Sequence, residues 1–390
     1  MRFSEFVDIW QKLPLKNFTE RIRRKNVNNT SNRPLTISAQ YGLIDQNDFF
    51  DRQIASKDMS GYYLLNNGEF AYNKIYSNKY PLGTVKRLDK YQNGALSSLY
   101  ICFNPKLNIV NSDFLVHYFE TSKWHKGILD IAGEGARNHG LLNMAVDDYF
   151  NTQHNIPSLK EQEKISKFLN LIVYRIETQS KIIEDLKLLE KSISHKIFGD
   201  NSLIKKDWKL TKLSDVLIER KTYDVKESSY PHVTLSKDGI YSKSDRYNRD
   251  FLVKDEEKNY KITHLNDICY NPANLKFGVI CLNTYGDAIF SPIYVTYEVK
   301  NGNDAYFISQ YVTNSTFIGH IRKYEQGTVY ERMAVSSEDF LKGKIYLPPI
   351  NIQNKIAQIF KLLDKKINIE LEILNKLKEQ KKYLLSNMFI

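Results

Sequence analysis

The sequence has few of the residues that build metal centres, disulfides or membrane spans. Its 390 residues include three cysteines, Cys102, Cys269 and Cys281, and none forms a CxxC pair or a Cys/His cluster with zinc spacing. We therefore expect small buried thiols in a reducing compartment. The N-terminus has no apolar signal core, and no apolar run approaches the length of a bilayer span. These absences predict a soluble cytoplasmic protein.

Sequence motifs of catalysis are also missing. There is no glycine-rich loop of the dinucleotide or P-loop type. Phe103-Asn-Pro-Lys106 and Tyr270-Asn-Pro-Ala273 lack the second proline and the aromatic residue with which an adenine methyltransferase holds a flipped base. The carboxylates of Lys254-Asp-Glu-Glu-Lys258 are typical of a solvated surface rather than of a metal nuclease. An enzyme that acts alone is therefore disfavoured.

The sequence does contain a duplication. Three motifs recur in the same order: Gly68-Glu-Phe-Ala-Tyr-Asn73 as Asn266-Asp-Ile-Cys-Tyr-Asn271, Ser97-Ser-Leu-Tyr100 as Ser291-Pro-Ile-Tyr294, and Ile156-Pro-Ser-Leu-Lys-Glu-Gln-Glu-Lys-Ile165 as Leu347-Pro-Pro-Ile-Asn-Ile-Gln-Asn-Lys-Ile356. The offset falls from 198 to 194 to 191 residues along the chain. The repeated unit is a whole domain followed by a long helix, far longer than a solenoid repeat. Duplication on this scale predicts a pseudo-twofold object, for which duplex DNA is a common partner.

The balance of charge favours a polyanionic partner. The chain has 56 Lys and Arg against 45 Asp and Glu, a formal net charge of +11 and a pI near 9.1. Charge alone does not separate nucleic acid from an anionic membrane, and the plain alternative is a basic surface that keeps the protein soluble. The aromatic content of 13% argues against disorder.

The domain organisation is predicted from these repeats. Short runs rich in β-branched and aromatic residues predict strands at Leu99–Phe103, Gly278–Leu282 and Pro292–Tyr297. Phe114–Trp124 and Tyr306–Tyr324 are predicted to be helical. We expect a mixed α/β domain over 1–155, a long helix over 156–199, a second mixed α/β domain over 200–346 and a second long helix over 347–390.

Both long helices carry a heptad pattern. The apolar seam positions are Ile165, Leu169, Ile172, Ile176, Ile183, Leu186, Ile193 and Ile197 in the first helix, and Ile356, Phe360, Leu363, Ile367, Leu374, Leu377, Leu384 and Met388 in the second. Even the polar interruptions correspond at an offset of 191, Gln179 with Glu370 and Glu190 with Lys381. A seam sustained for over four heptads predicts a coiled coil. Ser158 and Glu161 fit a capping box at the first helix start.

The linker predicts how the two helices are oriented. A helix from Ser158 to Phe198 is about 60 Å long, whereas the connector Gly199–Asp207 spans at most roughly 30 Å. A parallel pair requires the second domain to bridge the difference. In an antiparallel pair the end of the first helix lies beside the start of the second, so we expect an antiparallel coiled coil.

The chain resembles a type I restriction-modification specificity subunit. The residues that carry the resemblance are Ile37-Ser-Ala-Gln-Tyr-Gly-Leu43, Gly68–Asn73, Gly133-Glu-Gly-Ala-Arg137, Ile156–Gln162, Gln326-Gly-Thr-Val-Tyr330 and Leu347-Pro-Pro349. The order of two domains alternating with two long helices is more specific than any one motif. The resemblance covers nearly the whole chain.

The resemblance implies a non-catalytic DNA-binding subunit. Each target-recognition domain is expected to read one half of a bipartite asymmetric double-stranded site, while the helices set the spacer. The implied partners are two methyltransferase (modification) subunits, which methylate adenine with S-adenosylmethionine, and restriction/translocation subunits that use ATP and Mg. No cofactor and no metal is expected in this chain, and no membrane partner. The alternative is a stand-alone bivalent sequence-specific or architectural DNA-binding protein.

Candidate DNA-binding residues follow from the chemistry of base readout. Arg and Lys read guanine, and Asn and Gln read adenine, whereas phosphate contacts carry no sequence information. The candidates are Gln40, Lys74, Lys79, Lys86, Arg87, Arg137, Asn138 and His139 in the first domain, and Arg246, Arg249, Lys276, Arg322, Lys323, Tyr330 and Arg332 in the second. An ordinary exposed cation is the alternative for each of the charged residues, and a structural hydrogen bond is the alternative for His139.

Overall fold

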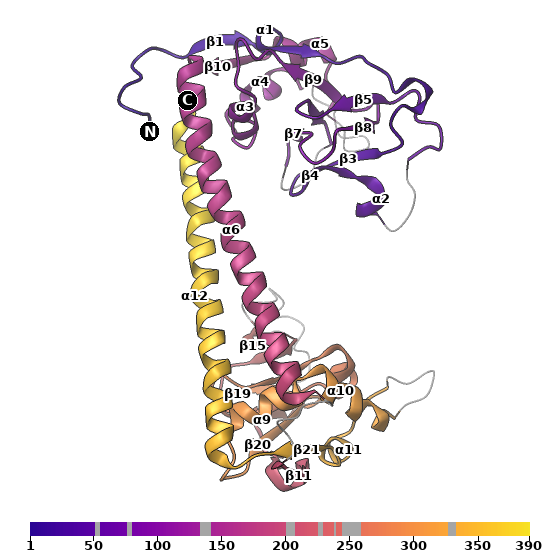
Figure 1. Cartoon of the computed structure of the whole chain (residues 1–390), viewed down its shortest axis with the longest axis vertical. Coiled ribbons are helices and arrows are strands. Elements are labelled where there is room, and N and C mark those ends of the chain that lie inside the picture. The colour runs from indigo at the N-terminus through magenta and orange to yellow at the C-terminus, as the bar shows by residue number, and fades with distance from the viewer. Residues whose placement is uncertain are drawn as a thin grey trace. The chain divides into compact units, whose positions relative to one another are not determined.

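The protein consists of two compact units, each built from one α/β region and parts of both long helices. The computed structural model describes residues 1–50, 55–75, 80–132, 142–199, 207–224, 229–237, 239–243, 259–326 and 333–390. Unit 1 contains Met1–Ser180 and Glu372–Ile390, and unit 2 contains Lys181–Leu371. Helices α6 (Leu159–Phe198) and α12 (Ile350–Met388) therefore contribute to both units (Figure 1).

The two helices are antiparallel within each unit. In unit 1 the start of α6 and the end of α12 enter one core, where Ile165 and Leu169 pack with Leu384 and Met388. In unit 2 the end of α6 meets the start of α12 in the same way, with Ile197, Ile356 and Phe360 in one cluster. Twelve of the sixteen seam residues are buried, and Ile176, Leu186, Ile193 and Leu363 are half-buried. The predicted fold of two α/β domains with an antiparallel coiled coil is confirmed.

Unit 1 holds two four-stranded sheets and one strand pair. The pair is β1 (Gln11–Pro14) with β10 (Gln153–Ile156), which lies next to the start of α6 (Figure 1). The first sheet has the order β2 (Thr19–Arg21), β9 (Ile101–Pro105), β6 (Phe70–Asn73) and β7 (Thr84–Arg87), and the second has the order β4 (Gly42–Asp45), β3 (Pro34–Ser38), β8 (Asn93–Leu96) and β5 (Tyr63–Asn66). Among the described residues of this unit, the helices besides the long pair are α1 (Leu15–Phe18), α2 (Gln46–Phe49), α3 (Ser112–Tyr118), α4 (His125–Ile131) and α5 (Val146–Asn151), with the 3-10 turn η1 (Val27–Asn29).

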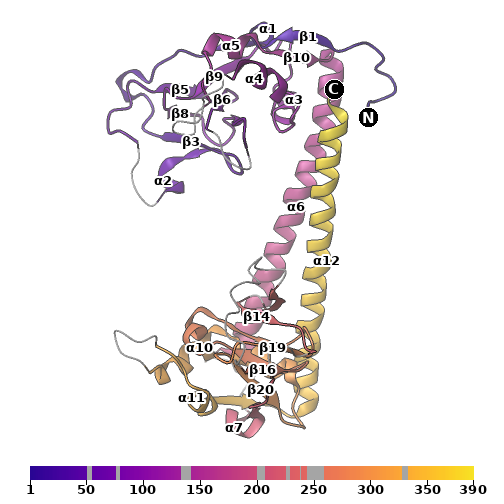
Figure 2. The ribbon, with the colours of Figure 1, turned by 180° about the vertical axis from the view of Figure 1, so that it is seen from behind.

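Unit 2 repeats this plan. The strand pair is β11 (Lys209–Lys212) with β21 (Lys344–Leu347), and the first sheet is β12 (Leu217–Glu219), β20 (Val295–Val299), β17 (Ile268–Tyr270) and β18 (Ile280–Leu282). The second sheet is divided into β13 (Tyr223–Asp224), β16 (Tyr260–Thr263) and β19 (Ala288–Phe290), and the hairpin β14 (Val233–Ser236) with β15 (Gly239–Ser242) (Figure 2). The described helices are α7 (Leu213–Val216), α9 (Ala305–Val312), α10 (Ser315–Ile321) and α11 (Ser337–Leu341), with the 3-10 turns η5 (Pro272–Phe277) and η6 (Arg322–Tyr324).

The first recurring motif is a turn held by a buried carboxylate. Gly68 and its counterpart Asn266 both have positive φ, and the next residue is Glu69 or Asp267. Arg24 pairs with Glu69 at 2.7 Å, and Arg220 pairs with Asp267 at 2.9 Å. Both carboxylates also accept a backbone N–H from the turn before them. The carboxylate therefore has the same structural role in both copies, although the glutamate side chain is one methylene longer than the aspartate side chain.

The second recurring motif is also a turn, which shifts the strands that follow it. Backbone hydrogen bonds run from Tyr100 N to Ser97 O and from Tyr294 N to Ser291 O. Strand β9 therefore begins at Ile101 rather than Leu99, and β20 begins at Val295 rather than Pro292. The β-branched and aromatic content of these runs predicted the strands but not the turns that start them.

The third recurring motif fixes the start of each long helix through a buried glutamine. Gln162 accepts a hydrogen bond from Asn111 N and donates to the carbonyls of Ile109 and Pro157. Its counterpart Gln353 accepts from Asp304 N and donates to Pro348 O. Asn111 and Asp304 are themselves the N-caps of α3 and α9. One side chain thus joins two helix starts and the chain between them.

Glu161 has a different partner from the one that a capping box implies. Its carboxylate accepts two hydrogen bonds from the Arg2 guanidinium, at 2.6 and 2.7 Å, and one from Trp10 Nε1 at 3.2 Å. The residue is 1% exposed, so the ion pair satisfies a charge that is out of water. The segment before β1 is thereby tied to the start of α6.

Replacement of Gln162 by leucine should destabilise unit 1 by about 2–4 kcal/mol, because three buried backbone groups lose their partner. Urea unfolding monitored by circular dichroism measures this loss. The matched control is Gln153→Leu, since Gln153 is exposed and should change stability by less than about 0.5 kcal/mol. Equal stability of the two variants would contradict the assigned role.

Candidate nucleic-acid interface

Each unit has a cleft between a long helix and its α/β region. In unit 1 the cleft encloses about 420 Å³ and is lined by the β6–β7 connection, by the α3–α4 segment and by Lys381 and Leu385 of α12. In unit 2 it encloses about 830 Å³ and is lined by the end of α6, by the α9–α10 segment, by Lys237 and by Lys276–Gly278.

The two clefts occupy equivalent positions in the repeat. Lys381 and Leu385 stand 191 residues after Glu190 and Ser194, which line the other cleft. Gly83 and Gly278, with φ of 76° and 77°, precede strands β7 and β18 and line one cleft each. Because a cleft is present at the equivalent place in both copies, it depends on the fold that the two units share rather than on the sequence of one loop.

The clefts differ in charge. Lys86, Lys381, His125 and Glu120 are the ionisable groups, apart from Tyr80, that line the unit 1 cleft. The unit 2 cleft has a cationic lining of Lys191, Lys237, Lys276 and Arg322, with His195 and a single carboxylate, Glu190. The formal charge is therefore about +1 in unit 1 and +3 in unit 2, with histidine neutral. A cationic concave surface attracts a polyanion.

An ion pair joins α12 to the α/β region at the unit 1 cleft. Lys381 Nζ lies 2.8 Å from Glu120 Oε2, and His117 Nδ1 lies 3.8 Å from the same oxygen. Burial raises the pKa of Glu120, but His117 and Lys381 outweigh it and lower that pKa to about 2. Burial also lowers the pKa of Lys86, an effect that Glu120 opposes and Lys381 reinforces.

A neutral contact takes the place of this ion pair in unit 2. Asn314 Nδ2 donates to Ser194 Oγ at 2.8 Å, so α6 is again joined to the segment between the two short helices. Glu190, at the position equivalent to Lys381, has its pKa raised by burial and by the nearby Asp364. The charge at this position is thus reversed between the two copies.

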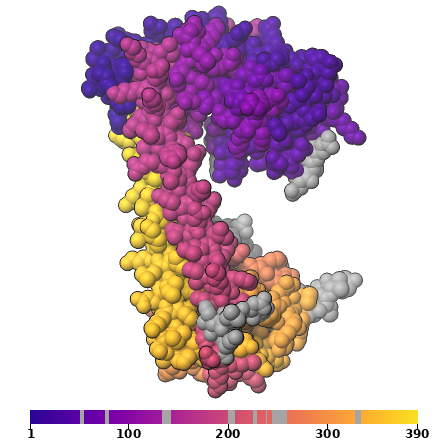
Figure 3. All heavy atoms as spheres, viewed as in Figure 1, coloured from indigo at the N-terminus to yellow at the C-terminus, as the bar shows by residue number. Residues whose placement is uncertain are grey.

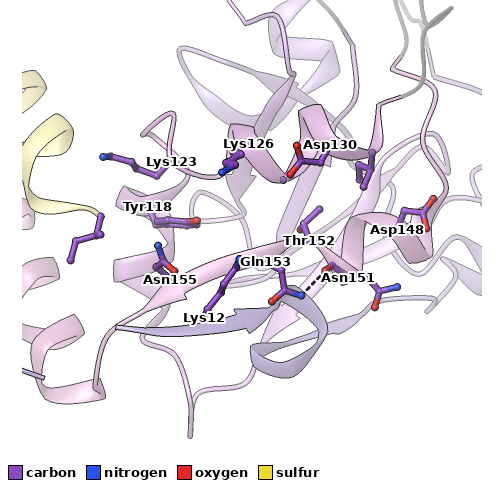
Figure 4. Close-up of a pocket in the computed structure, with 13 residues that line it drawn as sticks. Lys12, Tyr118, Lys123, Lys126, Asp130, Asp148, Asn151, Thr152, Gln153 and Asn155 are labelled. Atoms are coloured by element: carbon purple, nitrogen blue, oxygen red, sulfur yellow. Dashed lines mark hydrogen bonds between the residues drawn. The ribbon is translucent and has the colours of Figure 1, made fainter. Parts of the chain in front are cut away.

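A second pair of equivalent cavities lies at the strand pairs. In unit 1, Lys123 and Lys126 face Lys12 and Gln153 across a cavity of about 400 Å³ (Figure 4). The unit 2 counterpart, also about 400 Å³, is lined by Lys323 and by residues of β21. Asp130 and Asp148 offset the lysines in the first cavity, so its charge is mixed.

The structure separates the sequence candidates other than Arg87 into three groups. Lys86, Lys276 and Arg322 line the clefts, and the last also pairs with Glu325 at 3.3 Å. Gln40 is exposed, Lys74 is half-buried beside β6, and Lys323 lines the strand-pair cavity. Lys79, Arg137, Asn138, His139, Arg246, Arg249, Tyr330 and Arg332 lie outside the described residues.

Arg87 is bound to carboxylates of its own unit. Its guanidinium lies 2.6 Å from Asp89 and 2.7 Å from Asp113, and it also donates to Ser112 Oγ. These contacts join β7 to the start of α3 and leave little of the donor set for a base. Arg87 therefore acts first as a structural residue.

Sequence reasoning missed the helix residues that complete the clefts. Lys191, His195 and Lys381 lie in segments where the heptad pattern directs attention to the seam. Lys237 sits in the tight turn between β14 and β15, which gives no distinctive sequence signal. The sequence does show that Lys381 and Glu190 are 191 residues apart. That they line equivalent clefts follows only from the antiparallel packing of the helices.

Among the described residues, no group of three or more His, Cys, Asp or Glu side chains is placed to hold a metal ion. In the same part of the chain, no helix combines the length and apolar character that crossing a membrane requires.

Comparison with solved structures identifies the fold. A chain from a study entitled "Structural basis underlying complex assembly and conformational transition of the type I R-M system" is similar at 14% identity and a TM-score of 0.57, covering 98% of this chain and 97% of that one. The type I restriction-modification S subunit from M. genitalium is similar at 14% identity and a TM-score of 0.55, covering 100% and 99%. The likeness extends over both units.

Residues 205–379 match the family model of the type I restriction modification DNA specificity domain. This match covers the second α/β region and most of α12, whereas the similarity to the solved structures is a similarity of fold over the whole chain.

The Glu120–Lys381 pair predicts acid sensitivity in unit 1. The pKa of Glu120 is lowered in the folded state, so its stabilisation is present above about pH 4.5 and is lost as pH falls towards 2. In Glu120→Gln this part of the pH dependence should disappear, a difference of about 1–3 kcal/mol between pH 6 and pH 3. Thermal unfolding across this range measures it, and a parallel pH profile of the two proteins contradicts the assignment.

Proposed function

We propose that each α/β region reads one half of a bipartite asymmetric DNA site and that the cleft beside it receives the duplex. The observation that carries this proposal is the recurrence of a cationic cleft at equivalent positions in both units. Duplication with divergent lining suits a target whose two halves differ in sequence. The helix pair then sets the spacer between the half-sites.

The residues of the unit 2 cleft divide by the chemistry they offer. Lys191 and His195 come from a helix, which holds their backbone in a fixed place relative to the seam. Lysine is a compact cation suited to phosphate, whereas arginine offers the planar fork that pairs with guanine. We assign the lysines to phosphate contacts and Arg322 to either role, and the same assignment makes Lys86 the phosphate contact of unit 1.

The outer faces of the helix pair supply docking surfaces for the modification subunits. Leu171 in unit 1 and Leu362 in unit 2 are 62% and 60% exposed and stand 191 residues apart. Ile359 and Ile369 lie on the same flank of α12 as Leu362, because three- and seven-residue spacings share one helix face. Figure 3 shows α6 and α12 packed side by side, with side chains of both helices on the surface of this face. An exposed leucine at equivalent positions of the two helices suits two copies of one partner.

The partners bring the chemistry. We assign S-adenosylmethionine to the modification subunits, and ATP with Mg to the restriction and translocation subunits. The rival reading is a bivalent DNA-binding protein that acts alone. It gives no reason for an exposed leucine that recurs at an offset of 191, Leu171 in the first helix and Leu362 in the second.

Removing cations from the unit 2 cleft tests the DNA assignment. The double variant Lys191→Ala/Lys276→Ala should bind the methylated motif, defined by methylome sequencing, more weakly and with a salt slope lower by about two. The recognised sequence should stay the same, since phosphate contacts carry no sequence information. Fluorescence anisotropy against salt concentration measures the slope.

The matched control is Lys209→Ala/Lys212→Ala, which removes two exposed lysines of β11 that do not line the cleft. This control should keep the wild-type slope. An equal fall in both variants reports net charge alone and contradicts a phosphate-binding cleft.

Charge on one flank should remove one partner. In Leu171→Glu or Leu362→Glu alone, native mass spectrometry should show one modification subunit per chain, and in the double variant none, because a carboxylate is costly in an apolar interface. Leu188→Glu, at an exposed position on a different face of α6, should keep two. Unchanged stoichiometry in the double variant overturns the docking assignment.

A further inference from the structure

One apolar residue is buried in unit 1 and exposed at the equivalent position of unit 2. Tyr72 and Tyr270 correspond, and the β6–β7 and β17–β18 registers pair them with Val85 and Ile280. Three residues earlier stand Leu82, which is 8% exposed and part of the unit 1 core, and Phe277, which is 62% exposed. Each is followed by a glycine with φ near 76°.

The partner of the preceding tyrosine explains the difference in conformation. In unit 1 the Tyr72 hydroxyl donates to the carbonyl of Leu82 at 2.8 Å and holds that residue inward. In unit 2 the Tyr270 hydroxyl donates instead to Val335 O at 3.0 Å, and residues Pro272–Phe277 form a 3-10 turn. The turn ends at Phe277, whose ring is exposed on the surface. Packing in the core therefore does not explain why this position has an aromatic residue.

The surroundings of the ring indicate a nucleic-acid partner. Phe277 lines the cationic cleft, and Lys276 Nζ lies 5.2 Å from its ring centroid. Lys237 lines the same cleft, with Cε 3.9 Å from the position of a Cβ on the neighbouring Gly278. An exposed aromatic ring in a cleft with lysines combines an apolar contact for a base with cations for the adjacent phosphates.

Building on the proposed function, we propose that Phe277 is a specificity-determining residue of unit 2 that contacts the C5-methyl group of one thymine in the major groove. Apolar side chains discriminate thymine by this methyl group. A ring wedged between two stacked bases needs both faces free, whereas the Lys276 ammonium covers one face of this ring. The residue is 62% exposed, so part of the ring remains accessible for a methyl contact.

The proposal makes the two half-sites unequal. Leu82 is buried, so unit 1 has no apolar contact from this position. Sensitivity to the thymine methyl through this loop is therefore confined to the half-site that unit 2 reads.

Uracil substitution tests the contact directly. The probe is a duplex carrying the methylated motif of cells that express the chain with its modification subunit, with each thymine of the unit 2 half-site replaced in turn by deoxyuridine. The wild-type complex should lose about fourfold in affinity at one position, since a buried methyl group contributes roughly 0.8 kcal/mol. In Phe277→Ala the same replacement should have no effect, and 2-aminopurine beside that base should show no unstacking in the wild type.

The controls separate the possible failures. Leu265→Ala removes an equally exposed apolar residue of unit 2 that does not line the cleft, and it should retain the uracil effect. Loss of preference for the motif duplex over a scrambled duplex in the wild type overturns the proposed function itself. Retained preference with no uracil effect at any thymine, the same effect in Phe277→Ala, or unstacking of 2-aminopurine overturns the role of Phe277 alone.

Discussion

Each unit depends on apolar contact between its α/β region and two helix ends that are far apart in the sequence. The unit 1 core combines Trp10 and Phe114 with Ile165 from α6 and Phe389 from the end of the chain. The unit 2 core joins Phe198, Phe307 and Phe360 in the same way, with ring centroids 5.6 and 6.0 Å apart for the two pairs that include Phe198. The helix pair is thus part of both cores and more than a linker between them.

The packing of the helix ends on each α/β region also determines where the clefts lie. A cleft between a long helix and an α/β region keeps its shape only if the helix is fixed to that region. In unit 1 the fixing contacts are the shared core and the Glu120–Lys381 ion pair, and in unit 2 they are the shared core and the Asn314–Ser194 hydrogen bond. The framework is common, so the lining residues are free to differ between the copies, and the charge of the two clefts does differ.

The repeated motifs are mainly structural. Gln162 and Gln353 hold the helix starts, and Glu69 and Asp267 hold the turn before strands β6 and β17. Their recurrence reveals the duplication because the framework tolerates little change at buried, hydrogen-bonded positions. Leu82 and Phe277 show that the loop after the second strand of this sheet is not held to the same framework, since one is buried and the other exposed.

The sequence by itself determined the duplication, the heptad seam and the antiparallel orientation of the helices. A period of seven residues and a short linker are local properties, and no distant contact is needed to recognise them. The tertiary structure decided which cations share a surface. It engaged Arg87 with Asp89 and Asp113, and it brought Lys191, Lys237 and Lys276 from three separate segments to one cleft. Side-chain direction and pairing depend on packing between segments distant in the chain, and a single sequence carries no direct signal of that packing.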